Sequence, residues 1–272
     1  MILAILLGPY AAFLTMASVL TVQALFFADG GLLALGCNIF NLGFFPCVSA
    51  YPLIYKKLVG ERPTQGRILL GAMAAAILSL QMGAFGVVME TLFSGISELP
   101  FSTFVLMMQP IHLAIGIVEG LVTATVVAFV WKARPEIIEM APPLASAPSR
   151  SFKPVILGLV ALVVFTGGFL SWFASTHPDG LEWAIKGVTG KEEVEAPKAG
   201  AHGVLAGLQE KLAFLPDYDF KKPEGEAEAK KEESWPDVNP GRSLAGVLGA
   251  AITLLLVGAI GFGLKKYASH HG

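Results

Sequence analysis

Residues 101–131 read FSTFVLMMQPIHLAIGIVEGLVTATVVAFVW, a run in which His112 and Glu119 are the only ionisable side chains. A helix that crosses the roughly 30 Å hydrocarbon core of a bilayer needs about 20 mainly apolar residues, and this run is longer than that. Further apolar runs of sufficient length are 10–27, 31–55, 68–93, 154–174 and 243–264. The sequence therefore predicts an all-α, polytopic membrane protein with about six full transmembrane helices.

The composition supports the same class of protein. Hydrophobic residues make up 54% of the 272 residues and charged residues 15%, whereas a soluble domain has about a quarter of its residues charged. Residues 176–241 hold 14 of the 21 acidic and 8 of the 19 basic residues, which leaves this stretch at −6 and the remainder at +4. The remaining basic residues lie at the ends of apolar runs, a pattern that suits membrane orientation and argues against nucleic-acid binding.

The positions of the basic residues predict the membrane topology. They gather between the second and third runs, between the fourth and fifth, and after the sixth: Lys56, Lys57, Arg62, Arg67, Lys132, Arg134, Arg150, Lys153, Lys265 and Lys266. By the positive-inside rule these three regions face the cytoplasm, and so does the C-terminus. The turns near Asp29 and at 95–100 then lie outside, together with the acidic loop 176–241.

Pro9 predicts the start of a helix. Proline suits the first helical position, because the N–H that it lacks would have no partner there. Residues 1–8 are then the end of an earlier, inward-running segment, and helix 9–27 runs back out. We therefore expect a partial first segment before the six full helices, so that the given sequence starts in mid-membrane.

Composition also divides the chain. Residues 135–152 are rich in Pro, Ala and Ser and predict a linker between a larger bundle, 1–134, and a two-helix unit, 153–272. The two helices of that unit flank the acidic loop 176–241. Within the loop, the spacing of apolar residues over 203–215 predicts an amphipathic helix that lies on a surface.

Polar groups inside apolar runs are costly and are the first candidates for function. Asn38 and Asn41 are three residues apart and share one helix face; they either join helices or line a pathway. His112 and Glu119 are seven residues apart and also share a face, but about 10 Å along the axis separates them. They cannot chelate one ion unaided, so a hydrogen-bonded packing role competes with a role in ion binding.

Other unusual residues in the runs have simpler interpretations. Glu90, near the outer end of its run, is expected to reach the membrane interface. Cys37 and Cys47 fall on different helix faces and are expected to be small buried side chains and not a disulfide or a metal pair. Gly116 and Gly120 form a small-xxx-small pattern that lets another helix approach closely.

Motifs of several enzyme classes are absent from the sequence. There is no GxxxxGK[ST], HExxH or GxSxG, and GAIGFG at 258–263 lies inside an apolar run with no strand before it. One interpretation of the chain is an enzyme that uses His112 and Glu119 as acid and base, but no nucleophile accompanies these two residues. We expect a protein that is not an enzyme and needs no cofactor.

Three stretches resemble a known group of transport proteins. GPYAAFLTMASVLTVQALFFADGGLLALGCNIFNLG at 8–43 closely resembles the core of the CbiM/NikM family, the substrate-capturing membrane subunits of energy-coupling-factor (ECF) cobalt and nickel transporters. FSTFVLMMQPIHLAIGIVEGLVTA at 101–124 resembles a later helix of that family. HPDGLEWAI at 177–185 resembles the PDGLE element of the small CbiN/NikN subunit, in which two helices flank an extracytoplasmic loop.

The resemblance implies a function and partners. The chain would be the substrate-specificity component of an ECF-type ABC transporter for nickel or cobalt uptake, in the inner membrane of a bacterium or an archaeon. Its partners would be a transmembrane coupling subunit similar to CbiQ/NikQ and cytoplasmic ATPases similar to CbiO/NikO, on which ATP hydrolysis would occur. The alternative is a non-transporting scaffold or a degenerate remnant of such a subunit.

The sequence departs from the family at its N-terminus. In the family the metal is held mainly by the free N-terminus, by a histidine after the initiator Met and by a histidine upstream of the GP element. Here Met1 is followed by Ile2, and the sequence begins at the GP element. We therefore expect a truncated chain whose principal metal ligands are absent. The residues then expected to position the missing ligands, or to line the path of the ion, are Asn38, Asn41, His112 and Glu119.

Overall fold

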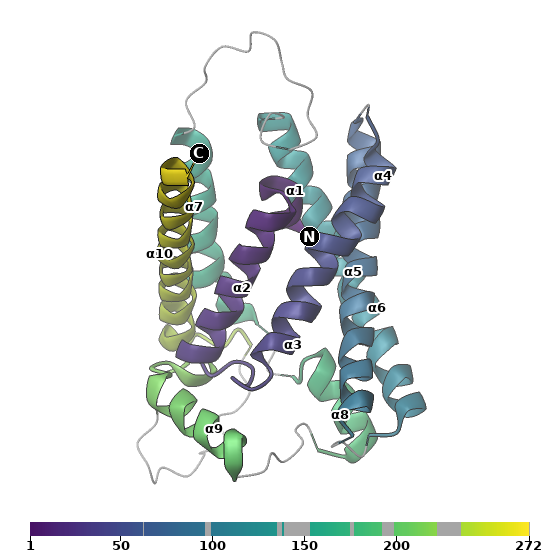
Figure 1. The fold of residues 1–272 in the computed structure, drawn as a ribbon, viewed down its shortest axis with the longest axis vertical. Helices are drawn as coiled ribbons and strands as arrows, with labels where there is room; N and C mark the ends of the chain where they lie inside the picture. The colour runs from purple at the N-terminus through teal and green to yellow at the C-terminus, as the bar shows by residue number, and fades with distance from the viewer. Residues whose placement is uncertain are drawn as a thin grey trace. The chain divides into compact units, whose positions relative to one another are not determined.

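The computed structural model describes residues 1–61, 63–95, 99–134, 138, 153–174, 177–191, 199–221 and 235–271. Every element in these ranges is helical, which confirms the all-α prediction (Figure 1). The elements, in chain order, are α1 (Ile2–Leu7), α2 (Pro9–Phe26), α3 (Leu35–Ile39), the π-helix η1 (Phe40–Tyr55), α4 (Lys56–Val59), α5 (Gln65–Ser94), α6 (Phe101–Ala133), α7 (Lys153–Gly168), the 3₁₀ turn η3 (Leu170–Phe173), α8 (Gly180–Thr189), α9 (Gly200–Leu212), the 3₁₀ turn η4 (Pro216–Tyr218) and α10 (Pro240–His271).

The helices confirm a polytopic membrane protein. In the described ranges, five helical segments are long and apolar enough to cross a bilayer: Pro9–Phe26, Leu35–Val59, Gln65–Ser94, Phe101–Ala133 and Pro240–His270. The fifth predicted run, 154–174, instead forms the shorter helix α7, which ends at Gly168 and is followed by η3. Helix α2 begins at Pro9 as predicted, and Gly8, with a φ of 77°, separates it from α1.

The chain divides into two compact units, and the division does not follow the order of the sequence. Unit 1 contains residues 1–17, 36–146 and 177–196, and unit 2 contains residues 18–35, 147–176 and 197–272. Helix α8 therefore packs with the first bundle, although it follows the predicted linker. The C-terminal half of α2 packs with the second unit, although it precedes that linker.

In unit 1, α5 packs against both α6 and η1. A Cβ added to Gly116 of α6 would lie 3.3 Å from the Cα of Ile77, and one added to Gly120 would lie 2.7 Å from Sδ of Met73. Two helices can approach this closely only because these glycines carry no side chain. In lipid there is no hydrophobic force between helices, so close packing of this kind is what holds them together. The predicted role of this glycine pair in helix packing is confirmed.

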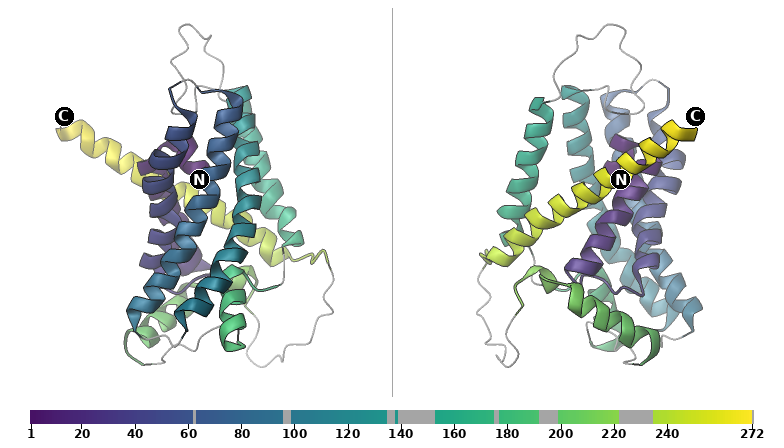
Figure 2. Two further views of the ribbon diagram at one scale, coloured as in Figure 1. Left: turned by 90° about the vertical axis from the view of Figure 1, so that its right-hand side faces the viewer. Right: turned by 60° about the vertical axis from the view of Figure 1, so that its left-hand side comes forward.

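In unit 2, α7 and α10 meet at two glycines. A Cβ on Gly246 would lie 2.7 Å from the carbonyl oxygen of Gly167, so the two backbones are in contact there. Figure 2 shows α10 as one continuous helix, and the GAIGFG stretch lies within it. That stretch is therefore part of a helix and not a nucleotide-binding loop, in agreement with its position inside an apolar run.

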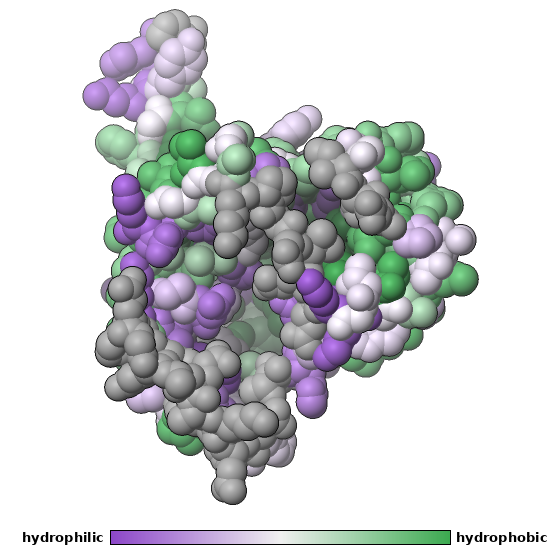
Figure 3. All heavy atoms as spheres, turned by 90° about the horizontal axis from the view of Figure 1, so that it is seen from below, coloured by the Kyte–Doolittle hydropathy of each residue, from purple (hydrophilic) through white to green (hydrophobic). Residues whose placement is uncertain are grey.

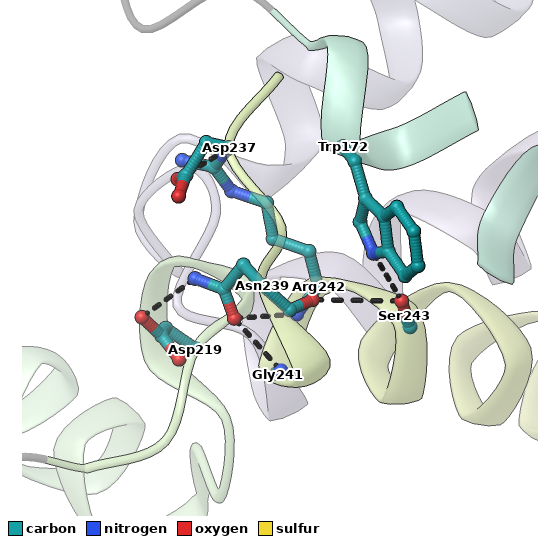
Figure 4. A network of polar contacts seen from close by, with 7 residues as sticks. All are labelled: Trp172, Asp219, Asp237, Asn239, Gly241, Arg242 and Ser243. Carbon is teal, nitrogen blue, oxygen red and sulfur yellow. Dashed lines mark hydrogen bonds and ion pairs between the residues drawn. The ribbon is translucent and has the colours of Figure 1, made fainter. Parts of the chain in front are cut away.

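Polar contacts fix the start of α10 (Figure 4). The Oδ1 of Asn239 accepts hydrogen bonds from the backbone N–H of Gly241 at 2.8 Å and of Arg242 at 3.3 Å, and its Nδ2 donates to Asp219 at 2.9 Å. The indole N–H of Trp172 donates to Ser243 at 2.7 Å. These bonds satisfy N–H groups that have no partner within the helix, and they join η3 to α10.

Helix α9, predicted at 203–215, is present at Gly200–Leu212. The segment after it packs on residues 18–35 of the same unit. Phe27 stacks on Tyr218 with 5.2 Å between ring centroids, and Leu215 is buried beside it. The side chain of Gln209 donates to the carbonyl oxygens of Ala24 at 3.0 Å and Gly30 at 2.7 Å. The predicted outer loop is thus anchored to the turn after α2.

The surface is consistent with a lipid environment. Large apolar side chains on the outer face of α10, such as Leu254, Leu255 and Phe262, are more than 70% exposed. The space-filling view from below shows extended areas of hydrophobic side chains on the surface, interspersed with hydrophilic ones (Figure 3). Apolar residues that face outward in this way are expected where lipid replaces water as solvent.

Candidate functional site

A polar contact inside unit 1 joins η1 to α5. The Nδ2 of Asn41 donates a hydrogen bond of 2.8 Å to Oε2 of Glu90. The Cys37 thiol, from α3, is hydrogen-bonded to the same carboxylate. Asn41 is buried and Glu90 is half-buried, whereas Cys37 is exposed. A carboxylate, an amide and a thiol from three elements therefore converge at one point.

Asn38 does not belong to this contact. Although it lies three residues before Asn41, it is only half-buried, and no hydrogen bond to its side chain occurs among the described residues. The change from α-helix to π-helix at Phe40 explains the difference, because i→i+5 bonding alters how residues rotate around the axis. The two asparagines therefore have different surroundings.

One prediction from the sequence is wrong here. Cys37 is exposed, so it is not a small buried side chain, whereas Cys47 is buried as expected. Glu90 is half-buried and accepts the hydrogen bond from Asn41, because in apolar surroundings a carboxylate gains most by pairing with a nearby donor. That Glu90 also reaches the membrane interface stays a prediction.

A second polar position lies where α6 meets α8. The Nδ1 of His112 lies 2.8 Å from the carbonyl oxygen of Met108. Because a carbonyl oxygen only accepts, Nδ1 carries the proton of this hydrogen bond. A Cβ on Gly180 would lie 2.9 Å from Cε1 of His112 and 3.2 Å from Nε2, so the first residue of α8 covers this edge of the imidazole.

The sequence of α8 explains why its first turn is well defined. The carboxylate of Asp179 accepts hydrogen bonds from the backbone N–H of Leu181 and Glu182, each at 2.8 Å. The Glu182 carboxylate in turn accepts from the N–H of Asp179 at 3.0 Å, which completes a capping box. The PDGLE motif, at 178–182, thus forms a rigid helix start whose glycine lies against His112.

Glu119 has a different position from His112. Glu119 is exposed and His112 is half-buried, and the structure shows no contact between these two described side chains.

One turn before His112, α6 is joined to α5 by two amides. Gln81 donates to the carbonyl oxygen of Gln109 at 3.0 Å, and Gln109 donates to that of Gln81 at 3.5 Å. Two glutamines in facing apolar runs are the signal that could have predicted this pair.

Neither polar position is a complete metal centre. Within the described ranges, no three His, Cys, Asp or Glu side chains lie close enough to hold one ion. A surface groove of about 770 Å³ lies between α5 and α6 near Lys132 and is lined mainly by Leu69, Leu70, Met73, Leu121 and Phe129. Because its lining is apolar, that groove suits lipid or another helix and not an ion.

Comparison with known proteins assigns most of the chain. Residues 1–137 match the family profile described as CbiM, the cobalt uptake substrate-specific transmembrane region, and residues 153–266 match that of the PDGLE domain. A putative fused nickel transport protein NikMN of Archaeoglobus fulgidus is 32% identical over 97% of this chain and 75% of its own length. No solved structure shows a significant match.

Two further relatives cover less of the chain. The fused nickel transport protein NikMN of Rhodobacter capsulatus is 32% identical over 80% of this chain and 67% of its own length. The cobalt transport protein CbiM of Sorangium cellulosum is 28% identical over 54% of this chain and 66% of its own length. The chain thus belongs to the CbiM family of cobalt uptake substrate-specific transmembrane proteins and carries a PDGLE domain after its CbiM region.

Proposed function

We propose that this chain is the substrate-specificity component of an ECF-type transporter that takes up nickel or cobalt ions. One observation carries the proposal: the CbiM and PDGLE matches follow each other along one chain, and a relative aligned over 97% of it is named a fused nickel transport protein. The spanning helices agree with a role inside the membrane. Nickel or cobalt is then the cargo and not a resident cofactor.

The proposal includes separate partners that supply energy. The sequence contains no P-loop, so ATP hydrolysis is assigned to cytoplasmic subunits similar to CbiO/NikO. A membrane subunit similar to CbiQ/NikQ would couple these ATPases to the present chain. The apolar outer faces of the helices offer surface for such a subunit as well as for lipid. The chain itself is assigned no catalytic residue.

The orientation of the chain is part of the proposal. Basic residues flank the end of α4 and the end of α6, and Lys265 and Lys266 lie in the last part of α10. The positive-inside rule assigns these ends, and the C-terminus, to the cytoplasm of a bacterial or archaeal cell. The loop 176–241, which contains α8 and α9, then faces the outside.

Four residues are proposed to guide the ion or to position its ligands. His112 is the best supported, because its Nδ1 is fixed by a backbone carbonyl, and such a bond orients a histidine whose Nε2 serves as ligand. Asn41 is supported by its bond to Glu90. Asn38 and Glu119 follow from their positions in apolar runs alone.

The test is uptake of nickel-63 or cobalt-57 by cells that lack their own transporter and produce this chain with its coupling partners. We expect uptake that depends on the chain and on ATP. His112→Ala should lower it at least about tenfold, the loss typical of groups that orient a metal ligand. Gly258→Ala is the matched control, because nothing lies within 4 Å of a Cβ at that position.

Uptake that is the same with and without the chain would contradict the proposal and support a scaffold that does not transport. Unchanged uptake in the His112 variant would remove this residue from the ion path while leaving the transport function intact. Protein levels in the membrane must be equal in all comparisons, since a loss of stability by itself lowers abundance.

A further inference from the structure

The groove between α5 and α6 in unit 1 combines an apolar wall with one charged end. It follows the first turns of α5 and the last turns of α6, where the two helices run side by side (Figure 1). Eight of its nine lining residues carry no charge, and the ninth is Lys132, in the last turn of α6. Its volume of about 770 Å³ is within the range of sites that hold a ligand of drug size.

The wall of the groove suits hydrocarbon. The hydroxyl of Thr125, which belongs to the lining, donates to the carbonyl oxygen of Leu121 in its own helix at 2.8 Å, so it needs no further partner. Leu70 and Phe129, on the two sides, are large and exposed. Such a surface is unfavourable in water and favourable against an acyl chain.

The length of the groove along α6 matches one leaflet of a bilayer. Leu121 and Lys132 are 11 residues apart, which is about 16 Å at about 1.5 Å per residue. The hydrocarbon core is roughly 30 Å thick, so one leaflet contributes about 15 Å of it. With Lys132 at the level of the headgroups, the groove reaches the middle of the membrane. One acyl chain fits this length, whereas a spanning helix needs a surface about twice as long.

The charge at the end of the groove selects among lipids. Lys132 is exposed, and among the described residues no acidic side chain forms an ion pair with its ammonium. The lining contains no carboxylate, so it offers nothing to the ammonium of a zwitterionic headgroup such as that of phosphatidylethanolamine. A headgroup that carries only the negative phosphate has no such mismatch. Basic groups beside spanning helices recognise anionic headgroups for this reason.

We propose that this groove binds an anionic glycerophospholipid such as phosphatidylglycerol. One acyl chain lies between α5 and α6, in contact with Leu70 and Phe129, and the phosphate pairs with the ammonium of Lys132. The long stem of the lysine lets its ammonium reach the headgroup while its methylene groups stay beside the chain. The site shares no residue with the positions proposed to guide the ion, so it does not rest on the transport function.

The experiment compares the binding of two lipids to the full chain. The purified, delipidated protein in detergent is titrated with phosphatidylglycerol or with phosphatidylethanolamine of the same acyl chains, and native mass spectrometry gives the Kd of the first bound lipid. We expect phosphatidylglycerol to bind about fivefold more tightly, which corresponds to about 1 kcal/mol for one lysine near a lipid surface. Lys132→Gln should remove this preference, and Lys132→Arg should keep it.

Matched controls separate the groove from the rest of the surface. Lys265→Gln removes an exposed lysine of α10, and the preference should remain. Ala128→Phe puts a ring into the groove and should weaken the first binding step of both lipids at least about tenfold, since a loss of about 60 Å² of apolar contact suffices for that factor. Val122→Phe adds the same ring at an exposed position of α6 outside the lining and should leave both Kd values unchanged.

Three results would overturn the proposal. The first is an equal Kd for the two lipids in the parent chain, and the second is a preference that survives Lys132→Gln. The third is an equal effect of Ala128→Phe and Val122→Phe, which would place the lipid elsewhere. The lysine variants change only an exposed side chain, so the test remains decisive if Ala128→Phe fails to fold.

A second measurement identifies the occupant of the groove in the membrane. The photoreactive residue p-benzoylphenylalanine takes the place of Phe129 in cells that produce the chain with its coupling partners. We expect illumination to give an adduct with phosphatidylglycerol. An adduct with phosphatidylethanolamine alone overturns the headgroup preference, and an adduct with another protein assigns the groove to a partner helix and overturns the proposal.

Discussion

The contact between Gly180 and His112 gives a sharp prediction about the packing of α8 on α6. In Gly180→Ala the new Cβ would lie 2.9 Å from Cε1 of His112 and 3.0 Å from Cδ1 of Ile115. Ordinary contacts between such atoms are longer than about 3.5 Å, so the helices must part by about 0.5 Å or the imidazole must leave its bond to Met108. Overpacking of this kind costs about 1–3 kcal/mol.

The better helix propensity of alanine offsets part of this cost, because glycine in a helix interior is about 1 kcal/mol less favourable. Gly180 is the first residue of α8, where the gain is smaller, so we expect a net loss of about 1–2 kcal/mol. For a chain of this size that corresponds to about 2–4 °C in apparent Tm for each kcal/mol. The assay is thermal unfolding of the detergent-solubilised chain, followed by loss of its monodisperse chromatographic peak.

Gly187→Ala is the matched control on the same helix. Its Cβ would lie 3.3 Å from Sδ of Met107, a flexible side chain that moves readily, so the apparent Tm should stay the same or rise. The penalty of Gly180→Ala should shrink by about 1 kcal/mol or more in a His112→Ala background. Equal effects of the two glycine variants, or an equal penalty in both backgrounds, would refute the reasoning.

Three further substitutions test other contacts. Gly120→Ala puts a Cβ 2.7 Å from Sδ of Met73 and should destabilise the α5–α6 contact by about 1–2 kcal/mol in thermal unfolding. Burial and the hydrogen bond to Asp29 raise the pKa of Tyr218, so its stabilising effect is complete below about pH 10 and disappears at higher pH. Tyr218→Phe should therefore cost about 1 kcal/mol at neutral pH and flatten the loss of apparent Tm above pH 10. Asn239→Ala removes the cap of α10 and should cost about 1–2 kcal/mol in the same assay.

Two exposed positions supply controls for these variants. Gly158→Ala in α7 meets nothing within 4 Å and should not lower the apparent Tm, in contrast to Gly120→Ala. Ser269→Ala near the end of α10 should leave stability unchanged, in contrast to Asn239→Ala. If the alkaline loss of stability is identical in Tyr218→Phe and the parent chain, the hydrogen bond to Asp29 does not contribute to it.

Much of the architecture could be predicted from local sequence. The long apolar runs determine the spanning helices, because in lipid the backbone must satisfy its own hydrogen bonds and a helix does this within one segment. Pro9 marked the start of α2, and the spacing of Gly116 and Gly120 marked a close helix contact. The family could also be identified from the sequence, and the CbiM and PDGLE matches confirm it.

The polar contacts were harder to predict. Cys37 and Glu90 lie in different apolar runs, and each one considered alone looked ordinary. Their positions depend on how α3 and η1 are rotated relative to α5, and the π-helix η1 changes that rotation in a way that no α-helical spacing shows. Asn38 and Asn41 looked equivalent for the same reason, but only Asn41 reaches Glu90.

The sequence by itself determined the class of fold, most of the spanning segments and the family, because each depends on hydrophobicity and short motifs that act within one stretch of chain. Only the tertiary structure decided that the PDGLE helix covers His112, and that a thiol, an amide and a carboxylate meet at Glu90. These contacts join residues far apart in the sequence. Their free energy depends on which helix faces meet, and that is a property of the packed bundle and not of any single segment.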